Sequence, residues 1–190
     1  MKTFLIIGLG NPGRQYADTR HNAGFMAADA LAAQLGAAFA PWAKAGADYL
    51  KAVYEGNTLY VLKPNTFMNL SGTAAAAFAN FYKIPPQNIL VIFDDMSLPL
   101  GAVRMRGGGS AGGQNGMKNI IELFGTQDIP RVRIGTGPRP DFFEGRDFVL
   151  SKFSAAEREI LKPALARAAA SALDFAASGL DIAMNRANAG

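Results

Sequence analysis

The sequence has 190 residues, 49% of them hydrophobic, and a formal net charge of +4, so it can bury one sizeable core and we expect a single domain over residues 1–190. The charge excess is compatible with a polyanionic partner but does not by itself identify one. Cysteine is absent and histidine occurs once, which excludes disulfides and thiolate metal sites and disfavours metal catalysis.

The N-terminal segment MKTFLIIGLG predicts a buried strand and not an export signal. Residues 3–9 form an aliphatic and β-branched run that a Gly/Asn/Pro/Gly cluster closes, as is typical of a central strand. The segment lacks the length and the cleavage region of a signal peptide. No stretch of the chain reaches the roughly 18 to 20 apolar residues that cross a membrane. We therefore expect a cytoplasmic protein without a membrane segment.

The next elements alternate between helix and strand patterns. Residues 22–35 place apolar side chains at helical spacing and end before a glycine. Two runs rich in β-forming residues, 49–54 and 59–62, flank a turn sequence and predict a hairpin. An alanine-rich helix is expected over residues 71–82, because two prolines follow shortly after it.

The central part of the chain contains two more strand patterns and one glycine-rich stretch. A fully apolar strand is expected at residues 89–93, ending at Asp94-Asp95, and a shorter strand at 131–134. Between them the sequence RMRGGGSAGGQNG predicts a loop that runs into a helix over residues 117–124.

The C-terminal region predicts a helical tail. Ser154-Ala-Ala-Glu157 is a capping box that opens the helix, which Pro163 should kink and Gly179 should end. Strands that alternate with helices along the chain predict an α/β fold. The expected architecture is a three-layer sandwich in which helices flank a mixed, largely parallel twisted sheet.

Residues 8–13, GLGNPG, fit the GxGxxG pattern of dinucleotide-binding folds. That fold needs its third glycine to open a helix directly, and an acidic residue at the end of the next strand about 20 residues further on. Here a polar stretch, residues 14–20, follows the motif, and a predicted helix comes next. This context disfavours a nicotinamide-dependent oxidoreductase, which we keep as an alternative.

The only histidine, His21, directly precedes the first predicted helix. An imidazole can accept a proton near neutral pH, although a helix-capping or surface histidine would look the same in a sequence. Asn11 and Asp94 follow apolar strands, whose carboxyl ends form the ligand crevice of parallel α/β sheets. A carboxylate can fix the tautomer of an imidazole, so Asp94 is the candidate partner of His21. The alternative is that Asp94-Asp95 is a solvated turn after the strand. Asp95 should point elsewhere, because side chains alternate along an extended chain.

Two further asparagines stand in predicted loops beside helix starts, Asn69 in KPNTFMNLSG and Asn115 in GGQNG. An amide can hold a carbonyl, a water or a developing oxyanion without adding charge. Asn69 could equally be an N-cap, and Asn115 a turn residue. The glycine-rich stretch 107–116 allows close approach of the backbone to a ligand. Its basic neighbours, which could meet phosphate groups, are Arg104, Arg106 and Lys118.

Four blocks of sequence occur in a fixed order and cover most of residues 4–140: GLGNPGRQYADTRHNAGF, KPNTFMNLSG, DDMSLPLG and GSAGGQNGMKNI. Together they resemble the bacterial-type peptidyl-tRNA hydrolase family. The resemblance implies a monomeric α/β sandwich without a metal or other cofactor, whose partner and substrate is peptidyl-tRNA. It also implies hydrolysis of the ester between the peptide and the 3′ ribose, which releases a free peptide and a reusable tRNA.

The resemblance also implies roles for individual residues. His21 matches the histidine that takes a proton from the attacking water, and Asp94 the aspartate that stabilises this histidine. Asn11 matches the asparagine that distinguishes blocked peptidyl substrates from free aminoacyl-tRNA, and Asn115 a holder of water or of the oxyanion. The matched positions for the peptide and the tRNA end are Tyr16, Phe67, Met68, Asn69 and Asn115, and the candidates for the acceptor stem are Arg104, Arg106, Lys118 and Arg133.

Two positions depart from the family pattern. The family usually has histidine where this chain has Gln114, and an acidic residue where it has Ser97. Gln114 can form hydrogen bonds but cannot titrate, and Ser97 removes a negative charge near the crevice. The alternative function is a non-catalytic RNA-binding or RNA-processing relative of the same fold. Such a protein has no need to keep the histidine, the aspartate and the three asparagines together.

Overall fold

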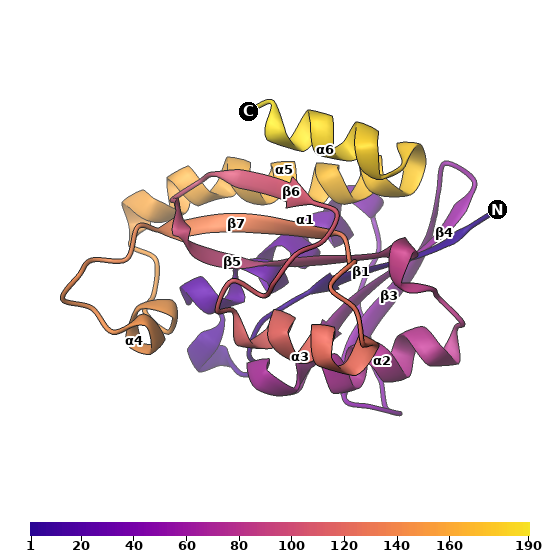
Figure 1. Cartoon of the computed structure of the whole chain (residues 1–190), viewed down its shortest axis with the longest axis horizontal. Coiled ribbons are helices and arrows are strands. Elements are labelled where there is room, and N and C mark those ends of the chain that lie inside the picture. Colours follow the sequence, from indigo (N-terminus) through magenta and orange to yellow (C-terminus); the bar gives the residue numbers. More distant parts are fainter.

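The computed structural model describes all residues from Met1 to Gly190 and contains one seven-stranded sheet (Figure 1). The strands are β1 (Thr3–Gly8), β2 (Ala40–Trp42), β3 (Ala47–Tyr54), β4 (Asn57–Pro64), β5 (Ile89–Pro99), β6 (Val103–Arg106) and β7 (Arg131–Gly137). Their order in the sheet is β2-β3-β4-β1-β5-β7-β6. The four central strands run parallel, whereas β2, β3 and β6 are antiparallel to their neighbours.

Helices cover both faces of this sheet. The helices are α1 (Ala23–Leu35), α2 (Ser71–Phe81), α3 (Asn115–Phe124), α4 (Gly145–Val149), α5 (Ala155–Ser178) and α6 (Leu180–Asn188), with short 3-10 turns η1 (Arg14–Tyr16), η2 (Arg20–Asn22), η3 (Met68–Leu70) and η4 (Pro86–Asn88). Helices α1, α5 and α6 pack on one face, and α2 and α3 on the other. In Figure 1, α5 and α6 lie above the sheet and α2 and α3 below it. This three-layer arrangement confirms the predicted fold class.

The central strand β1 shows why a layer forms on each face. Phe4 and Ile6 belong to the core under α1 and α5, whereas Leu5 and Ile7 belong to the core under α2. All four side chains are buried. A strand that buries both of its faces has a continuous apolar run in its sequence, which is the pattern of this segment.

The predicted strands and helices are present, with bounds that differ by a few residues, and the capping box at Ser154 opens α5 as expected. One predicted boundary was wrong, because β5 continues past Asp94-Asp95 to Pro99. It does so because β7 runs alongside and pairs with it as far as Gly137. Residues 104–106, predicted as part of a loop, belong to β6 because they pair with β7. The short elements β2 and α4 were missed.

The close packing of α1 on the sheet positions the functional site. A Cβ atom on Gly24 would lie 2.3 Å from the Ile92 carbonyl oxygen and 2.5 Å from backbone atoms of Leu9. Only glycine therefore allows α1 to begin directly against β1 and β5. β1 ends at Gly8, which pairs with Ile92 in the parallel strand β5, so Asp94 lies just beyond the end of β1. The start of α1 brings η2 with His21 to the same place.

Candidate active site

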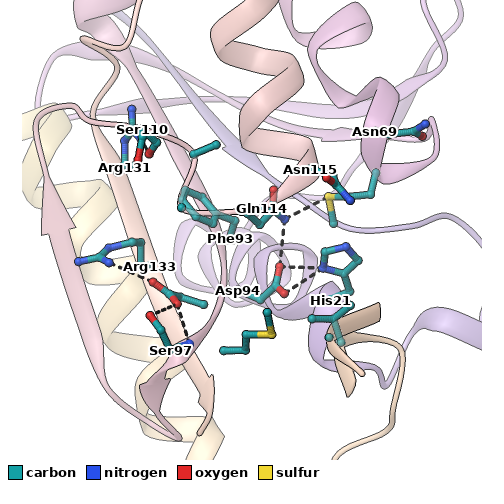
Figure 2. A pocket seen from close by; sticks show the side chains of 18 of the residues that line it. His21, Asn69, Phe93, Asp94, Ser97, Ser110, Gln114, Asn115, Arg131 and Arg133 are labelled. Carbon is teal, nitrogen blue, oxygen red and sulfur yellow. Dashed lines mark hydrogen bonds and ion pairs between the residues drawn. The ribbon is translucent and has the colours of Figure 1, made fainter. Parts of the chain in front are cut away.

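A cavity of about 800 Å³ lies beyond the carboxyl end of β1, over the middle of β5 and the first residues of β7. Its walls come from η2, η3, β5, β7, the start of α3, the α4 region and residues 106–113, and Figure 2 shows part of this lining. We refer to residues 107–113 as the glycine-rich loop. The volume falls within the range of about 300 to 1,000 Å³ that is usual for small-molecule sites. The cavity gathers most of the candidate residues and is therefore the candidate active site.

His21 and Asp94 form a buried pair in this cavity (Figure 2). The Nδ1 atom of His21 lies 3.0 Å from Oδ1 and 2.9 Å from Oδ2 of Asp94, and the two residues are only 8% and 3% exposed. An ionised carboxylate can only accept hydrogen bonds, so Nδ1 carries the proton. Nε2 makes no hydrogen bond within the protein, which leaves its lone pair for a ligand.

Asp95 points away from His21, as the alternation along a strand predicts. Its Oδ2 accepts a hydrogen bond from Nη1 of Arg133 at 3.0 Å. Its Oδ1 accepts hydrogen bonds from the backbone N–H and the hydroxyl of Ser97, at 2.9 and 2.6 Å. The two neighbouring carboxylates therefore have different surroundings, and Asp94 is buried in the site and is not part of a solvated turn.

Asn11 is held in one orientation by three hydrogen bonds. Its Oδ1 accepts from the backbone N–H of Met68 at 2.8 Å. Its own backbone N–H donates to Oδ1 of Asn22 at 2.8 Å, and its carbonyl accepts from Nδ2 of Asn22 at 3.0 Å. The bond to Met68 fixes which end of the Asn11 amide is the oxygen, and the Nδ2 donor makes no hydrogen bond within the protein and can serve a ligand.

The other predicted contacts to peptide and tRNA end lie in different places. Asn69 in η3 and Asn115 at the start of α3 line the cavity and are exposed, and their side-chain amides make no hydrogen bond within the protein. Phe67 is 58% exposed at the cavity rim, whereas Met68 beside it is buried. Tyr16 lies in η1 and does not line the cavity, so the structure does not bring it together with the other residues.

Of the four cations predicted to contact tRNA, two line the cavity and two do not. Arg106 and Arg133 line the cavity. The guanidinium of Arg104 instead donates to the carbonyls of Val103 and Gly190, and Lys118 is exposed on α3 outside the cavity. The fold therefore places two of the four at the candidate site.

Comparison with known proteins decides the family. A family model described as peptidyl-tRNA hydrolase matches residues 5–190. The chain belongs to the peptidyl-tRNA hydrolase family. It is 56% identical to the peptidyl-tRNA hydrolase of Elusimicrobium minutum, over 97% of this chain and 98% of that protein, and 44% identical to the one of Nocardia farcinica, over 96% and 94%. The crystal structure of peptidyl-tRNA hydrolase from Acinetobacter baumannii superposes with a TM-score of 0.92 at 34% identity, covering 98% of this chain and 95% of that one.

The family prediction from the four sequence blocks is thereby confirmed, and the non-catalytic RNA-binding alternative is not favoured. No group of three or more His, Cys, Asp or Glu side chains is arranged to hold a metal ion. None of the helices has the length and apolar character needed to cross a membrane.

Two features of the cavity were not predicted from the sequence. Gln114 was noted only as a departure from the family pattern, but its Nε2 donates to Oδ1 of Asp94 at 3.1 Å (Figure 2). Arg131 was not considered, yet it lines the cavity together with Arg133. Residues two apart on a strand share a face, so the spacing of the two arginines could have indicated this.

Arg131 is a buried cation that supports the glycine-rich loop. It donates to the carbonyls of Ile129, Gln127 and Ser110, at 3.1, 2.9 and 2.7 Å, and forms no ion pair with a carboxylate. Burial lowers the pKa of its guanidinium, and the nearby charge of Arg133 lowers it further. Arg131 therefore adds a positive charge without a carboxylate partner to one wall of the cavity, whereas the neighbouring Arg133 is paired with Asp95.

Proposed function

We propose that the chain hydrolyses the ester bond of peptidyl-tRNA and that His21 is the general base. Membership of the peptidyl-tRNA hydrolase family supports the reaction. The contact of His21 Nδ1 with both oxygens of Asp94 carries the proposal for the base. This contact leaves the lone pair of Nε2 to take a proton from a water molecule.

In the proposed reaction, the water attacks the ester carbonyl as Nε2 of His21 removes its proton. The resulting imidazolium is stabilised by Asp94 and then returns the proton to the leaving 3′ oxygen of the ribose. The amides of Asn115 and Asn69, which have no partner within the protein, donate hydrogen bonds to the oxyanion and to the peptide. The products are a peptide with a free carboxylate and a tRNA with an intact 3′ hydroxyl.

Asn11 supplies a physical basis for choosing blocked substrates. Its free atom is the Nδ2 donor, because the bond from Met68 identifies Oδ1 as the amide oxygen. An acylated α-amine presents a carbonyl oxygen that accepts this hydrogen bond. A free α-ammonium has only donors, so it would lose hydration and face another donor. The same orientation therefore favours peptidyl-tRNA over aminoacyl-tRNA.

The positive wall of the cavity suits the phosphate groups of the tRNA end. Arg106, Arg131 and Arg133 line it, and phosphate contacts of this kind give binding that weakens as salt rises. Tyr16, Arg104 and Lys118 lie outside the cavity. Tyr16 stays a predicted contact to the peptide and the tRNA end, and the other two stay predicted contacts to the acceptor stem. The monomeric state and the cytoplasmic location also stay predictions.

The test is release of N-acetylated amino acid from N-acetyl-aminoacyl-tRNA, with unblocked aminoacyl-tRNA as the second substrate. We expect cleavage of the blocked substrate only. His21→Ala removes the base, and His21→Asn is its matched control, because an amide can still donate to Asp94 but has no basic lone pair. Both should lower turnover by about 10²- to 10⁴-fold, the usual contribution of a general base. Wild-type turnover in either variant would exclude His21 as the base. If the unaltered protein binds tRNA but cleaves neither substrate, the alternative of a non-catalytic RNA-binding relative would be favoured.

A further inference from the structure

Gln114 connects the catalytic pair to helix α3. It is the N-cap of α3 and is only 8% exposed. Its Oε1 accepts from the backbone N–H of Met117 at 2.7 Å, and its Nε2 donates to Oδ1 of Asp94 at 3.1 Å and to Sδ of Met68 at 3.2 Å. Figure 2 shows the side chain lying between Asp94 and the start of the helix. Both polar atoms of the side chain are therefore in use.

The chemistry of the amide explains why glutamine fits this position. Helix N-caps are usually Ser, Thr, Asp or Asn, whose short side chains accept from the first turn. Glutamine also accepts there, through Oε1, and its greater length lets the second amide atom reach a neighbouring strand. Because Met117 fixes Oε1, the atom facing Asp94 must be the Nε2 donor.

The carboxylate of Asp94 consequently has a donor on each side. His21 Nδ1 contacts both of its oxygens, and Gln114 donates to Oδ1 as well. A carboxylate held by two donors cannot rotate without breaking a buried hydrogen bond, which leaves a buried polar group unsatisfied. The orientation of Asp94, and with it that of the imidazole, is therefore tied to the start of α3, where Asn115 is the first residue.

We propose that Gln114 is a positioning residue for the hydrolysis: it holds Asp94, and through Asp94 the base His21, in a fixed relation to Asn115. This inference rests on the proposed function. Gln114 does this without titrating, so it adds no ionisation of its own to the site. The charged and titratable side chains that line the same cavity are His21, Asp94, Asp95, Arg106, Arg131, Arg133 and Arg146.

Two variants of Gln114 separate this role from simple helix capping. Gln114→Glu keeps the shape of the side chain and the oxygen that accepts from Met117. It replaces the amide nitrogen that donates to Asp94 with a carboxyl oxygen, so that two carboxyl groups face each other. Gln114→Met keeps the length and removes both polar atoms. Ser154→Ala is the matched control, because Ser154 caps α5 by accepting from Glu157 and lies outside the cavity.

The measurements are kcat and KM for N-acetyl-aminoacyl-tRNA, the rate between about pH 5 and 8, and Tm. We expect kcat to fall by about 10-fold or more in both Gln114 variants with KM changed less than about twofold, since orientation and not binding is lost. Gln114→Glu should also alter the pH profile, because an added ionisable carboxyl group beside Asp94 changes the charge near the imidazole. Ser154→Ala should lower Tm and leave kcat unchanged.

The inference is overturned if Gln114→Met keeps the wild-type kcat, or if its kcat falls no more than that of Ser154→Ala at a similar loss of Tm. Its failure is distinguishable from failure of the proposed function. Inactive His21 variants together with fully active Gln114 variants would refute only the positioning role. Active His21 variants would refute the general base itself.

Discussion

Two buried regions of this molecule are held together in different ways. Beyond the carboxyl end of β1 and around Asp94 of β5, polar side chains from η2, β5 and the start of α3 are joined by directional hydrogen bonds. Between β3, β4 and α2, aromatic rings pack around Phe78, with ring centroids 4.8 Å away for Trp42, 5.3 Å for Tyr60 and 4.7 Å for Tyr82.

The two regions differ in how strictly their contacts fix the positions of the side chains. Rings in contact gain free energy from buried area and can tolerate small shifts, because dispersion and hydrophobic burial are weakly directional. Each polar group of the other region has one or two defined partners, and losing one leaves a buried group unsatisfied. We therefore expect changes in the aromatic region to affect mainly stability, and changes in the polar region to affect mainly turnover and specificity.

The largest effect on turnover should come from Asp94→Asn, which keeps the size of the side chain. An amide in place of the carboxylate can donate to Nδ1 of His21, which favours the tautomer with its proton on Nε2 and so removes the base. We expect kcat to fall by about 10³-fold or more, with Tm lowered by only a few degrees. Steady-state kinetics and thermal unfolding check this, and a variant with kcat within tenfold of the wild-type value would contradict it.

Phe78→Ala should show the opposite pattern. Phe78 is fully buried, and removing its ring should destabilise the fold by about 3 to 5 kcal/mol. Because neither Phe78 nor the three rings packed on it line the cavity, the folded fraction should keep its kcat. Urea unfolding gives the free energy, and kinetics at a temperature where the variant is folded give kcat. A large loss of kcat in fully folded protein would show that the two regions are not separate.

Asn11→Asp tests specificity within the polar region. The substitution retains an acceptor for the Met68 N–H and changes the free atom from a donor to a negatively charged acceptor. We expect kcat/KM for N-acetyl-aminoacyl-tRNA to fall by roughly 10- to 100-fold, while the relative rate for the unblocked substrate rises. Competition between the two substrates measures the ratio, and Asn11→Ala, which has neither donor nor acceptor, is the control. An unchanged ratio in Asn11→Asp would remove Asn11 from substrate choice.

The smallest effect concerns alkaline pH and the aromatic region. Burial raises the pKa of Tyr60 and of Tyr82, and the neighbouring tyrosines raise them further. The folded protein thus retains phenolic protons that the unfolded chain loses near the ordinary value of 10.0. The associated stability is fully present below that pH and is lost as the pH rises through the higher folded values. Urea midpoints measured from pH 8 to 11 should fall less steeply in Tyr82→Phe, and identical slopes would contradict the prediction.

Much of the fold could be predicted because its strongest signals are local. The continuous apolar runs of β1 and β5 predict buried strands, and the Ser154 capping box marks the start of a helix. The extension of β5 to Pro99 and the existence of β6 could not be predicted, because both depend on pairing with β7 from a later part of the chain.

In the candidate site, too, local sequence signals could be interpreted, whereas contacts between distant parts of the chain could not be predicted. The pairing of Asp94 with His21 could be anticipated, since one residue follows an apolar strand and the other precedes a helix that packs on that strand. The contact of Gln114 with Asp94 and that of Arg131 with the Ser110 carbonyl depend on the path of the glycine-rich loop, which its sequence does not specify. Tyr16 shows the converse, because its neighbourhood in sequence to His21 does not bring it into the cavity.

The central claim is that a single imidazole is the base for hydrolysis, and the pH dependence of the single-turnover rate tests it most directly. The measurement uses N-acetyl-aminoacyl-tRNA with protein in excess, between about pH 5 and 8, the range in which imidazoles change charge. We predict that the rate of the wild-type protein falls when acid removes the basic lone pair of the imidazole, and that His21→Asn lacks this dependence. A wild-type rate that is constant over the range, or an acid limb that persists in His21→Asn, would contradict the account.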